Sequence, residues 1–392
     1  MKKRLAAALV LVIGIACLGA GVQRGGGVYQ RAEAEEETKK TQDLAKDYEA
    51  ADAGLTFWYA DADYGAFFEQ ASRDYYEATG VKVQPVRKEG TDYIGVIYSA
   101  TMKEEIFPDV YLLPGGLLEE AYFCGLAAEE KNGAGYEGVC EQALAASAID
   151  GRMIAYPLSF NGCVFVCQNG YFEEQPASLQ AIIDYSDENE PPENVEYLLE
   201  WDVNDPFFDF PFIANSVRFE KSEAGSLEVL YDEALYQKDL EYFSGILQSF
   251  SMHADTVSRD KVVEDFLAGK TLCAIVDTKA IKDLEGYSYS LMQMPRLNEE
   301  LTSGVCAITD MLAVNEFSGH KSEAAEFARF VMLEEADKLW EMTGYYPVRK
   351  ADHLLARDII AYEAYENALA VPGSIQARDF WITLQETIRK YF

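Results

Sequence analysis

Two aromatic rings and two carboxylates follow one another where the first strand-like run of the chain ends. Trp58 and Tyr59 close the run Leu55–Tyr59, and Asp61 and Asp63 come directly after it. In open α/β sheets, ligands bind at the carboxyl ends of the strands. Aromatic rings cover the apolar face of a ligand, and carboxylates fix its polar rim. The stretch therefore predicts contact with a small polar ligand, while capping of the following helix is the other role open to the two aspartates.

The residues around this stretch indicate the elements that would position it. We expect strands and helices to alternate over 55–59, 64–79, 81–86, 92–105 and 109–113. Strands separated by helices of this length are typical of βαβ units on a parallel sheet. Asp63 is the expected N-cap of the first helix, and Gly80 is its expected stop.

The pattern changes at residue 152. Two strands lie close together in the sequence, over 152–157 and 160–167. The second half then predicts helices near 177–185, 227–250 and 256–268, strands over 271–276, 287–294 and 307–314, and helices to the end. The mixture predicts an α/β fold.

The composition sets broad limits on function. The 392 residues are enough for two domains, and a hydrophobic content of 49 % allows a large core. The net charge is −34 and the isoelectric point is about 4.4. A surface for nucleic acid needs clustered Lys and Arg, so DNA and RNA are not expected as partners. Acidity of this size suits a soluble protein that must not adhere to anionic surfaces.

The N-terminus carries the pattern of an exported protein. Residues 2–4 are Lys-Lys-Arg, and an apolar run follows over residues 5–22, as in a signal peptide. Cys17 follows Gly-Ile-Ala, and small residues before a cysteine resemble the cleavage site of a bacterial lipoprotein. Gly14 departs from that site, which has a branched apolar residue there. We expect export with lipidation at Cys17; an uncleaved anchor over 1–22 is the alternative.

Residues 23–53 predict a disordered tether. They begin with Gln-Arg-Gly-Gly-Gly and continue with many Glu and Lys residues, a composition that cannot bury a core. A tether behind an export signal places the folded part outside the cell, at the outer face of the membrane.

Six further cysteines are predicted to be mainly buried thiols. They are Cys124, Cys140, Cys163, Cys167, Cys273 and Cys306. Cysteine in apolar, strand-like runs acts as a small hydrophobic residue. Cys163 and Cys167 lie in one strand, about 13 Å apart, which is too far for a disulfide. Cys124 and Cys140 are the only pair for which we consider a bond. The histidines are isolated and no metal-ligand spacing occurs, so neither a metal nor another cofactor is expected.

Several short motifs, weak singly, occur in an order that resembles the extracellular solute-binding proteins of ABC importers, in the branch that includes maltodextrin-binding proteins. The similarity covers about residues 54–392. The motifs are Tyr-Glu-Ala-Thr-Gly-Val-Lys-Val at 76–83, Pro-Asp-Val-Tyr-Leu-Leu at 108–113, Asp-Gly-Arg-Met-Ile-Ala-Tyr-Pro at 150–157, Phe-Leu-Ala-Gly-Lys-Thr-Leu-Cys-Ala-Ile at 266–275, Lys-Ser-Glu-Ala-Ala-Glu-Phe at 321–327 and Thr-Gly-Tyr-Tyr-Pro at 343–347.

The resemblance implies two α/β lobes with a ligand cleft between them and a hinge that the chain crosses more than once. The N-lobe would hold residues 54–157 and 300–342, and the C-lobe 158–299 and 343–392. Such a protein is a monomer without enzymatic activity. It captures a sugar or oligosaccharide and delivers it to the permease subunits of its transporter.

The resemblance also implies ligand contacts from the C-lobe. The segment 204–214 is similar to a maltodextrin-binding segment with an acid, a proline and aromatic rings. Asp205 would bind a sugar hydroxyl, and Phe207, Phe208 and Phe210 would lie against sugar faces. Trp381 matches a stacking tryptophan, and Tyr345 lies in the late turn. The other role open to these rings is packing in the core.

The chain departs from the maltodextrin pattern at several charged positions. Asn161 stands where those proteins have a glutamate, and Lys279 stands where they have a tryptophan. Leu-Pro-Gly-Gly-Leu at 113–117 replaces a tryptophan and an Asp-Arg pair. The particular sugar therefore does not follow from the resemblance, although Asn161 keeps its place among the expected ligand contacts.

Two other functions remain open from the residues alone. Aspartates beside aromatic rings, including Asp61, Asp63 and Asp205, would also hold a polyamine through ion pairs and cation–π contacts. Paired carboxylates are the catalytic groups of glycoside hydrolases, but an acidic chain supplies such pairs by composition alone, and no catalytic signature is present.

Overall fold

The computed structural model describes residues 46–90, 92–103, 106–131, 133, 135–221, 227–250, 252, 257–370 and 375–391. The expected export segment 1–22, with Cys17, and most of the expected tether lie outside the described residues. Residues 46–50 are helical, where we expected a disordered tether, because Ala, Lys and Glu in this segment have high helix propensity. Contacts divide the chain before Asp52, and the following paragraphs concern the unit that begins there.

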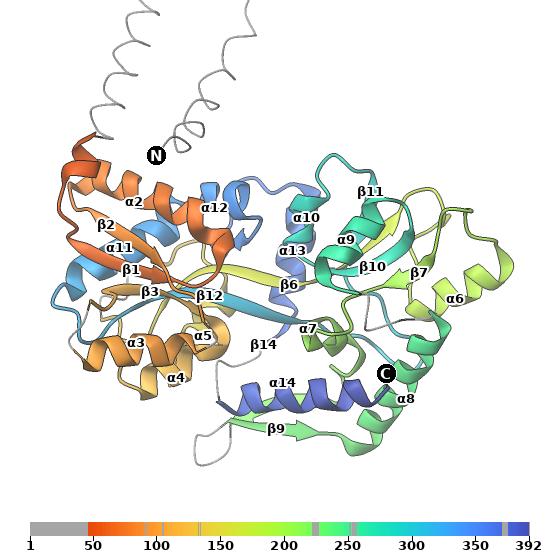
Figure 1. Ribbon diagram of the computed structural model, residues 1–392. Helices are drawn as coiled ribbons and strands as arrows, with labels where there is room; N and C mark the ends of the chain where they lie inside the picture. Colours follow the sequence, from red (N-terminus) through yellow and green to blue (C-terminus); the bar gives the residue numbers. More distant parts are fainter. Residues whose placement is uncertain are drawn as a thin grey trace, which may run out of the picture. The chain divides into compact units, whose positions relative to one another are not determined.

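A mixed sheet runs through this unit (Figure 1), with the strand order β2-β1-β3-β12-β6-β10-β7. Its strands are β1 (Leu55–Tyr59), β2 (Val83–Arg87), β3 (Val110–Pro114), β6 (Tyr156–Gln168), β7 (Tyr197–Glu200), β10 (Thr271–Asp277) and β12 (Cys306–Val314). Strand β1 pairs in parallel with β2 and β3, as the βαβ pattern predicts. Strand β12 runs antiparallel to both β3 and β6.

Strand β6 joins two regions of this sheet. Its first part pairs with β12, up to Gly162 opposite Ala307. Its last part pairs with β10, starting at Cys163 opposite Asp277, and with β11 (Tyr289–Met292). The sequence predicted two strands here, because polar and small residues interrupt the apolar run. The structure has the short strand β5 (Arg152–Met153) and then the single strand β6, which runs through the expected break at 158–159. The partner of β6 changes further along, between Gly162 and Cys163. We call the β12 side of this change the N-terminal sheet region and the β10 side the C-terminal sheet region.

Strand β1 contributes side chains to two hydrophobic clusters, because successive side chains point to opposite faces. Phe57 packs edge-on against Phe68 of α2 (Gly65–Thr79), with ring centroids 4.4 Å apart. Trp58 lies in the other cluster with Ile97 of α3 (Tyr93–Met102). The two helices therefore cover opposite faces of the N-terminal sheet region.

Strand and helix boundaries in the second half depend on individual caps. The predicted helix over 227–250 is instead a strand, β9 (Leu227–Tyr231), followed by a helix, α8 (Glu233–Ser249). Asp232 ends the strand and accepts a hydrogen bond from the Leu235 amide, 3.1 Å away, as an N-cap.

The other elements are η1 (Ala62–Tyr64), η2 (Gly115–Leu117), α4 (Leu118–Phe123), α5 (Glu141–Ala146), β4 (Ala148–Ile149), β5 (Arg152–Met153), α6 (Leu179–Glu188), α7 (Pro206–Asp209), η3 (Phe210–Phe212), β8 (Val217–Lys221), α9 (Arg259–Leu267), α10 (Ala280–Asp283), α11 (Lys321–Glu334), α12 (Ala336–Thr343), β13 (Tyr346–Pro347), α13 (Ala356–Glu366), β14 (Leu369–Ala370), α14 (Ile375–Ile388) and η4 (Arg389–Tyr391).

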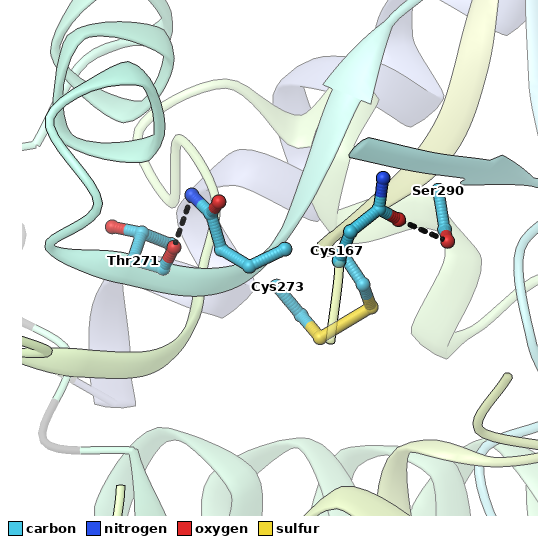
Figure 2. Close-up of a disulfide and its surroundings, with 6 residues drawn as sticks. Cys167, Thr271, Cys273 and Ser290 are labelled. Atoms are coloured by element: carbon cyan, nitrogen blue, oxygen red, sulfur yellow. Dashed lines mark hydrogen bonds between the residues drawn. A yellow bond between two sulfur atoms is a disulfide. The ribbon is translucent and has the colours of Figure 1, made fainter. Parts of the chain in front are cut away.

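One disulfide links β6 to β10, between Cys167 and Cys273 (Figure 2), whose Cα atoms are 4.2 Å apart. The two residues are direct partners in the antiparallel register. Our expectation of buried thiols was wrong for this pair, and Cys124 and Cys140 are both free. A register that brings together residues 106 positions apart has no local signature in the sequence. None of the helices in the described residues is long and apolar enough to cross a membrane.

Candidate functional site

The end of β1 lies beside a tyrosine from the far end of the chain. Asp61 caps the short helix η1 by accepting a hydrogen bond from the Asp63 amide, 2.9 Å away. Its other oxygen accepts a hydrogen bond from the Tyr345 hydroxyl at 2.9 Å. The Tyr345 ring stacks on the ring of Tyr64, with centroids 4.8 Å apart and an interplanar angle of 3°. Two aspartates and two parallel aromatic rings therefore meet at the expected place.

A lysine from the C-terminal sheet region completes this cluster. Lys279 follows β10, and its ammonium forms an ion pair with the Asp63 carboxylate. The same ammonium lies 5.0 Å from the centroid of the Tyr345 ring. We expected Asp63 to be the N-cap of α2, and this was wrong. Tyr64 holds the N-cap position, and the Asp63 carboxylate pairs with the lysine instead.

The base of the cluster is a chain of hydrogen-bonded hydroxyl and carboxyl groups. The buried Tyr64 hydroxyl donates to Asp310 of β12 at 2.7 Å and lies 2.5 Å from the Ser159 hydroxyl. Burial raises the pKa of the Asp310 carboxyl to about 6, and the charge of Asp61 adds to the shift. Burial also raises the pKa of Tyr345, and the charge of Asp61 again adds to it, so the phenol stays protonated and donates its hydrogen bond. We call Asp61, Asp63, Tyr64, Lys279, Asp310 and Tyr345 the junction cluster.

Asn161 lies at the crossing of β6 and belongs to a separate network. Its amide nitrogen donates to Asp277 at 3.1 Å, and its amide oxygen accepts from the Thr278 hydroxyl at 2.9 Å. Asp277 also forms an ion pair with Arg259 at 3.0 Å. The last residue of β10 and the residue after it therefore already engage both ends of the Asn161 amide.

The aromatic segment after Asn204 is packed into the C-terminal sheet region. Phe207, Phe208 and Phe210 are only 8 %, 4 % and 0 % exposed. Asp205 caps α7 by accepting a hydrogen bond from the Phe207 amide at 3.0 Å. Trp381 of α14 is partly exposed and packs against Phe210, with ring centroids 5.4 Å apart. Among these aromatic residues, the tryptophan has the greatest access to solvent.

The two aromatic residues of β1 are also largely buried. Trp58 is 2 % exposed, and the ammonium of Lys88 lies 3.9 Å from the centroid of its ring. Tyr59 is 7 % exposed, and its ring lies 5.4 Å from that of Phe68. The structure therefore brings together Asp61, Asp63 and Tyr345 from our expected contacts, and it places the two β1 rings in the core beneath them.

Three members of the junction cluster were absent from the sequence prediction. We treated Tyr64 only as the first residue of the helix expected over 64–79. We noted Lys279 only as a departure from the maltodextrin pattern. Asp310 could have been found from the sequence, because an aspartate inside the apolar strand Cys306–Val314 needs a polar partner. Within the part of the chain that the structure describes, no group of His, Cys, Asp or Glu side chains could hold a metal ion.

The sheet regions joined by β6, with a polar cluster at their junction, define a protein of the two-lobe periplasmic-binding-protein type. The chain belongs to the family of bacterial extracellular solute-binding proteins, whose model matches residues 70–366. No curated protein matches the chain.

Solved structures share the fold at low sequence identity. A cyclo/maltodextrin-binding protein in complex with maltotetraose has a TM-score of 0.72 at 15 % identity, over 86 % of this chain and 91 % of that one. An extracellular solute-binding protein from Staphylococcus aureus in complex with maltose has a TM-score of 0.68 at 18 % identity, over 86 % and 92 %. A Thermus thermophilus maltotriose-binding protein has a TM-score of 0.70 at 15 % identity, over 86 % and 93 %.

Proposed function

We propose that the chain captures a sugar or oligosaccharide between two lobes and delivers it to the permease of an ABC transporter. The observation that carries the proposal is the junction cluster. Carboxylates, a lysine, a phenol and an aromatic ring face come together there from both sheet regions. Charged and polar groups of this kind bind sugar hydroxyls, and aromatic rings cover sugar faces. The maltodextrin-related ligands of the similar structures support a sugar as the ligand class.

The proposed lobes are those expected from the sequence, namely 54–157 with 300–342 and 158–299 with 343–392. The change of strand partners along β6, from Ala307 opposite Gly162 to Asp277 opposite Cys163, supports a hinge near this boundary. In this arrangement Asp63 belongs to one lobe and Lys279 to the other. A ligand that contacts both residues would favour the closed form, because only that form offers both at once.

The proposed direct ligand contacts are Asp61, Asp63, Tyr345 and Lys279. Trp381 is proposed as a further contact because it is partly exposed. Trp58, Tyr59, Phe207, Phe208 and Phe210 support the site from the core, because little of their surface is exposed. Asn161 and Asp205 act through the loops that they hold. The protein is proposed to act as a monomer without catalysis, exported and held at the outer face of the membrane by lipidation at Cys17.

A thermal-shift screen with the full chain tests the ligand class. A ligand that binds only the native state raises the melting temperature. We expect a rise with maltose, maltotriose or another oligosaccharide, and a smaller rise with Asp63→Asn than with the wild type. Glu316→Gln is the matched control, because Glu316 pairs with Lys321 within one lobe. Hydrolysis of the sugars during incubation, or no response to any of them, would contradict the proposal.

Polyamine binding is the second candidate, and one observation favours it. The Lys279 ammonium is held by a carboxylate and lies over the Tyr345 ring, and a ligand ammonium would need this same pair of groups. Spermidine in the same screen distinguishes the two ligand classes. A salt-sensitive shift with spermidine and none with sugars would select the polyamine.

A further inference from the structure

A second ion pair joins the two sheet regions outside the junction cluster. Arg378 of α14 donates from Nη1 to Oε2 of Glu120 on α4, over 2.6 Å. These residues lie 258 positions apart in the chain. The Arg378 side chain is 47 % exposed and that of Glu120 is 27 % exposed, so solvent and salt reach the contact.

The helix that carries Arg378 is fixed to the C-terminal sheet region. Phe380 lies two residues further along α14. Its ring meets the rings of Phe210 and Phe219 edge-on, with centroids 6.2 and 5.4 Å apart. Helix α14 also contacts α7 and β9, and it meets η2, which directly precedes α4. The ring contacts of Phe380 therefore attach the helix that carries Arg378 to this region.

The helix that carries Glu120 is fixed to the N-terminal sheet region. Its neighbours Leu118 and Ala121 are 2 % and 0 % exposed, in the cluster that contains Trp58 and Tyr111. The ion pair therefore joins two helices whose apolar residues lie in different hydrophobic clusters. Before α14 the chain also pairs with the N-terminal sheet region, through β14 on β12.

We propose that Glu120 and Arg378 are positioning residues that hold the lobes closed from outside the ligand site. The proposal rests on the lobes of the proposed function, since α4 belongs to one and α14 to the other. Opening would separate the two helices, so the pair contributes only to the closed form. An equilibrium shifts only by such a difference between its two states. An exposed pair of this kind changes the ratio of closed to open forms about two- to fivefold, and added salt weakens it.

The test measures the distance between the lobes in ligand-free full chain. Spin labels are attached at Arg73→Cys on α2 and Lys238→Cys on α8, two exposed positions. Cys17 and the exposed Cys124 are changed to Ser. Pulsed electron spin resonance then gives the distance distribution. Glu120→Gln removes the ion pair and keeps the size of the side chain, and Arg378→Gln removes it from the other side with a shorter side chain. Glu316→Gln and Lys321→Gln are matched controls, because that pair, at 2.8 Å, lies within one lobe.

We expect Glu120→Gln and Arg378→Gln to increase the population at longer distances, and high salt to do the same to the wild type. The charge-swapped double variant Glu120→Arg/Arg378→Glu should return the distribution toward the wild type, which a purely structural role would not produce. Distributions unchanged by either single variant, or an equal change in the controls, would overturn the proposal. Because no ligand is used, failure of sugar binding in the thermal-shift screen leaves this test unaffected and identifies the ligand class as the error.

Discussion

Asp63 and Lys279 form an ion pair although they lie 216 positions apart in the chain. One follows the first strand of the N-terminal sheet region, and the other follows β10 of the C-terminal region. The lysine stands where the maltodextrin pattern has a tryptophan, so an ion pair takes the place of a stacking ring. Changing either residue of this pair is therefore the most direct way to test which class of ligand the protein binds.

Lys279→Met should weaken binding of a neutral oligosaccharide by about 1.5–3 kcal/mol, the usual contribution of a hydrogen bond to a charged group. The same change should strengthen binding of spermidine, because it frees Asp63 and the Tyr345 ring. Isothermal titration calorimetry with both ligands measures the two effects. Lys321→Met, which removes a lysine paired within one lobe, should change neither affinity. An unchanged affinity for whichever ligand binds would remove Lys279 from the site.

Tyr345→Phe should lower the free energy of unfolding by about 1 kcal/mol, since it deletes the hydrogen bond to Asp61 and keeps the ring. Tyr345→Ala also removes the ring that stacks on Tyr64 and should cost more. Urea denaturation of both variants gives these differences. If Tyr345 also binds ligand, the Phe variant should lose affinity beyond its loss of stability, while equal affinity would limit the residue to a structural role.

Asp310→Asn should raise stability at neutral pH. The folded protein holds the Asp310 pKa at about 6, above its value in the unfolded chain, so folding favours the protonated form. Its contribution is therefore fully present below about pH 4 and is lost as the pH rises through about 6. At pH 7.5 we expect the variant to gain roughly 1–3 kcal/mol over the wild type, with little gain at pH 4. Denaturation curves across this range measure the gain, and a gain independent of pH would contradict the assignment.

Loss of the Cys167–Cys273 disulfide should destabilise the protein by up to about 5 kcal/mol, because the bond closes a long loop in the unfolded chain. The double variant Cys167→Ser/Cys273→Ser and the reduced wild type should melt at similar, lower temperatures. Cys124→Ser changes an exposed free thiol and should leave the melting temperature unchanged. A double variant that melts at the temperature of the oxidised wild type would show that the bond contributes nothing.

Local sequence patterns were sufficient to predict most of the strands and helices of the N-terminal sheet region. The strand Leu55–Tyr59 and the stop of α2 at Gly80, with φ of 75°, follow from apolar runs and from the freedom of glycine at positive φ. The same kind of reasoning failed for β9. Its separation from α8 depends on one aspartate cap, which an apolar pattern across 227–250 does not reveal.

The sequence by itself determined the α/β class, the order of the motifs and the position of Asp61 and Asp63 after the first strand, because these depend on residues close together in the chain. Only the tertiary structure decided which distant groups meet them. The pairing of Asp63 with Lys279, the stacking of Tyr345 on Tyr64 and the disulfide between Cys167 and Cys273 all depend on how strands align across β6 and on how loops meet at its crossing. Such alignments are set by packing of the whole core, and so no local run of residues encodes them.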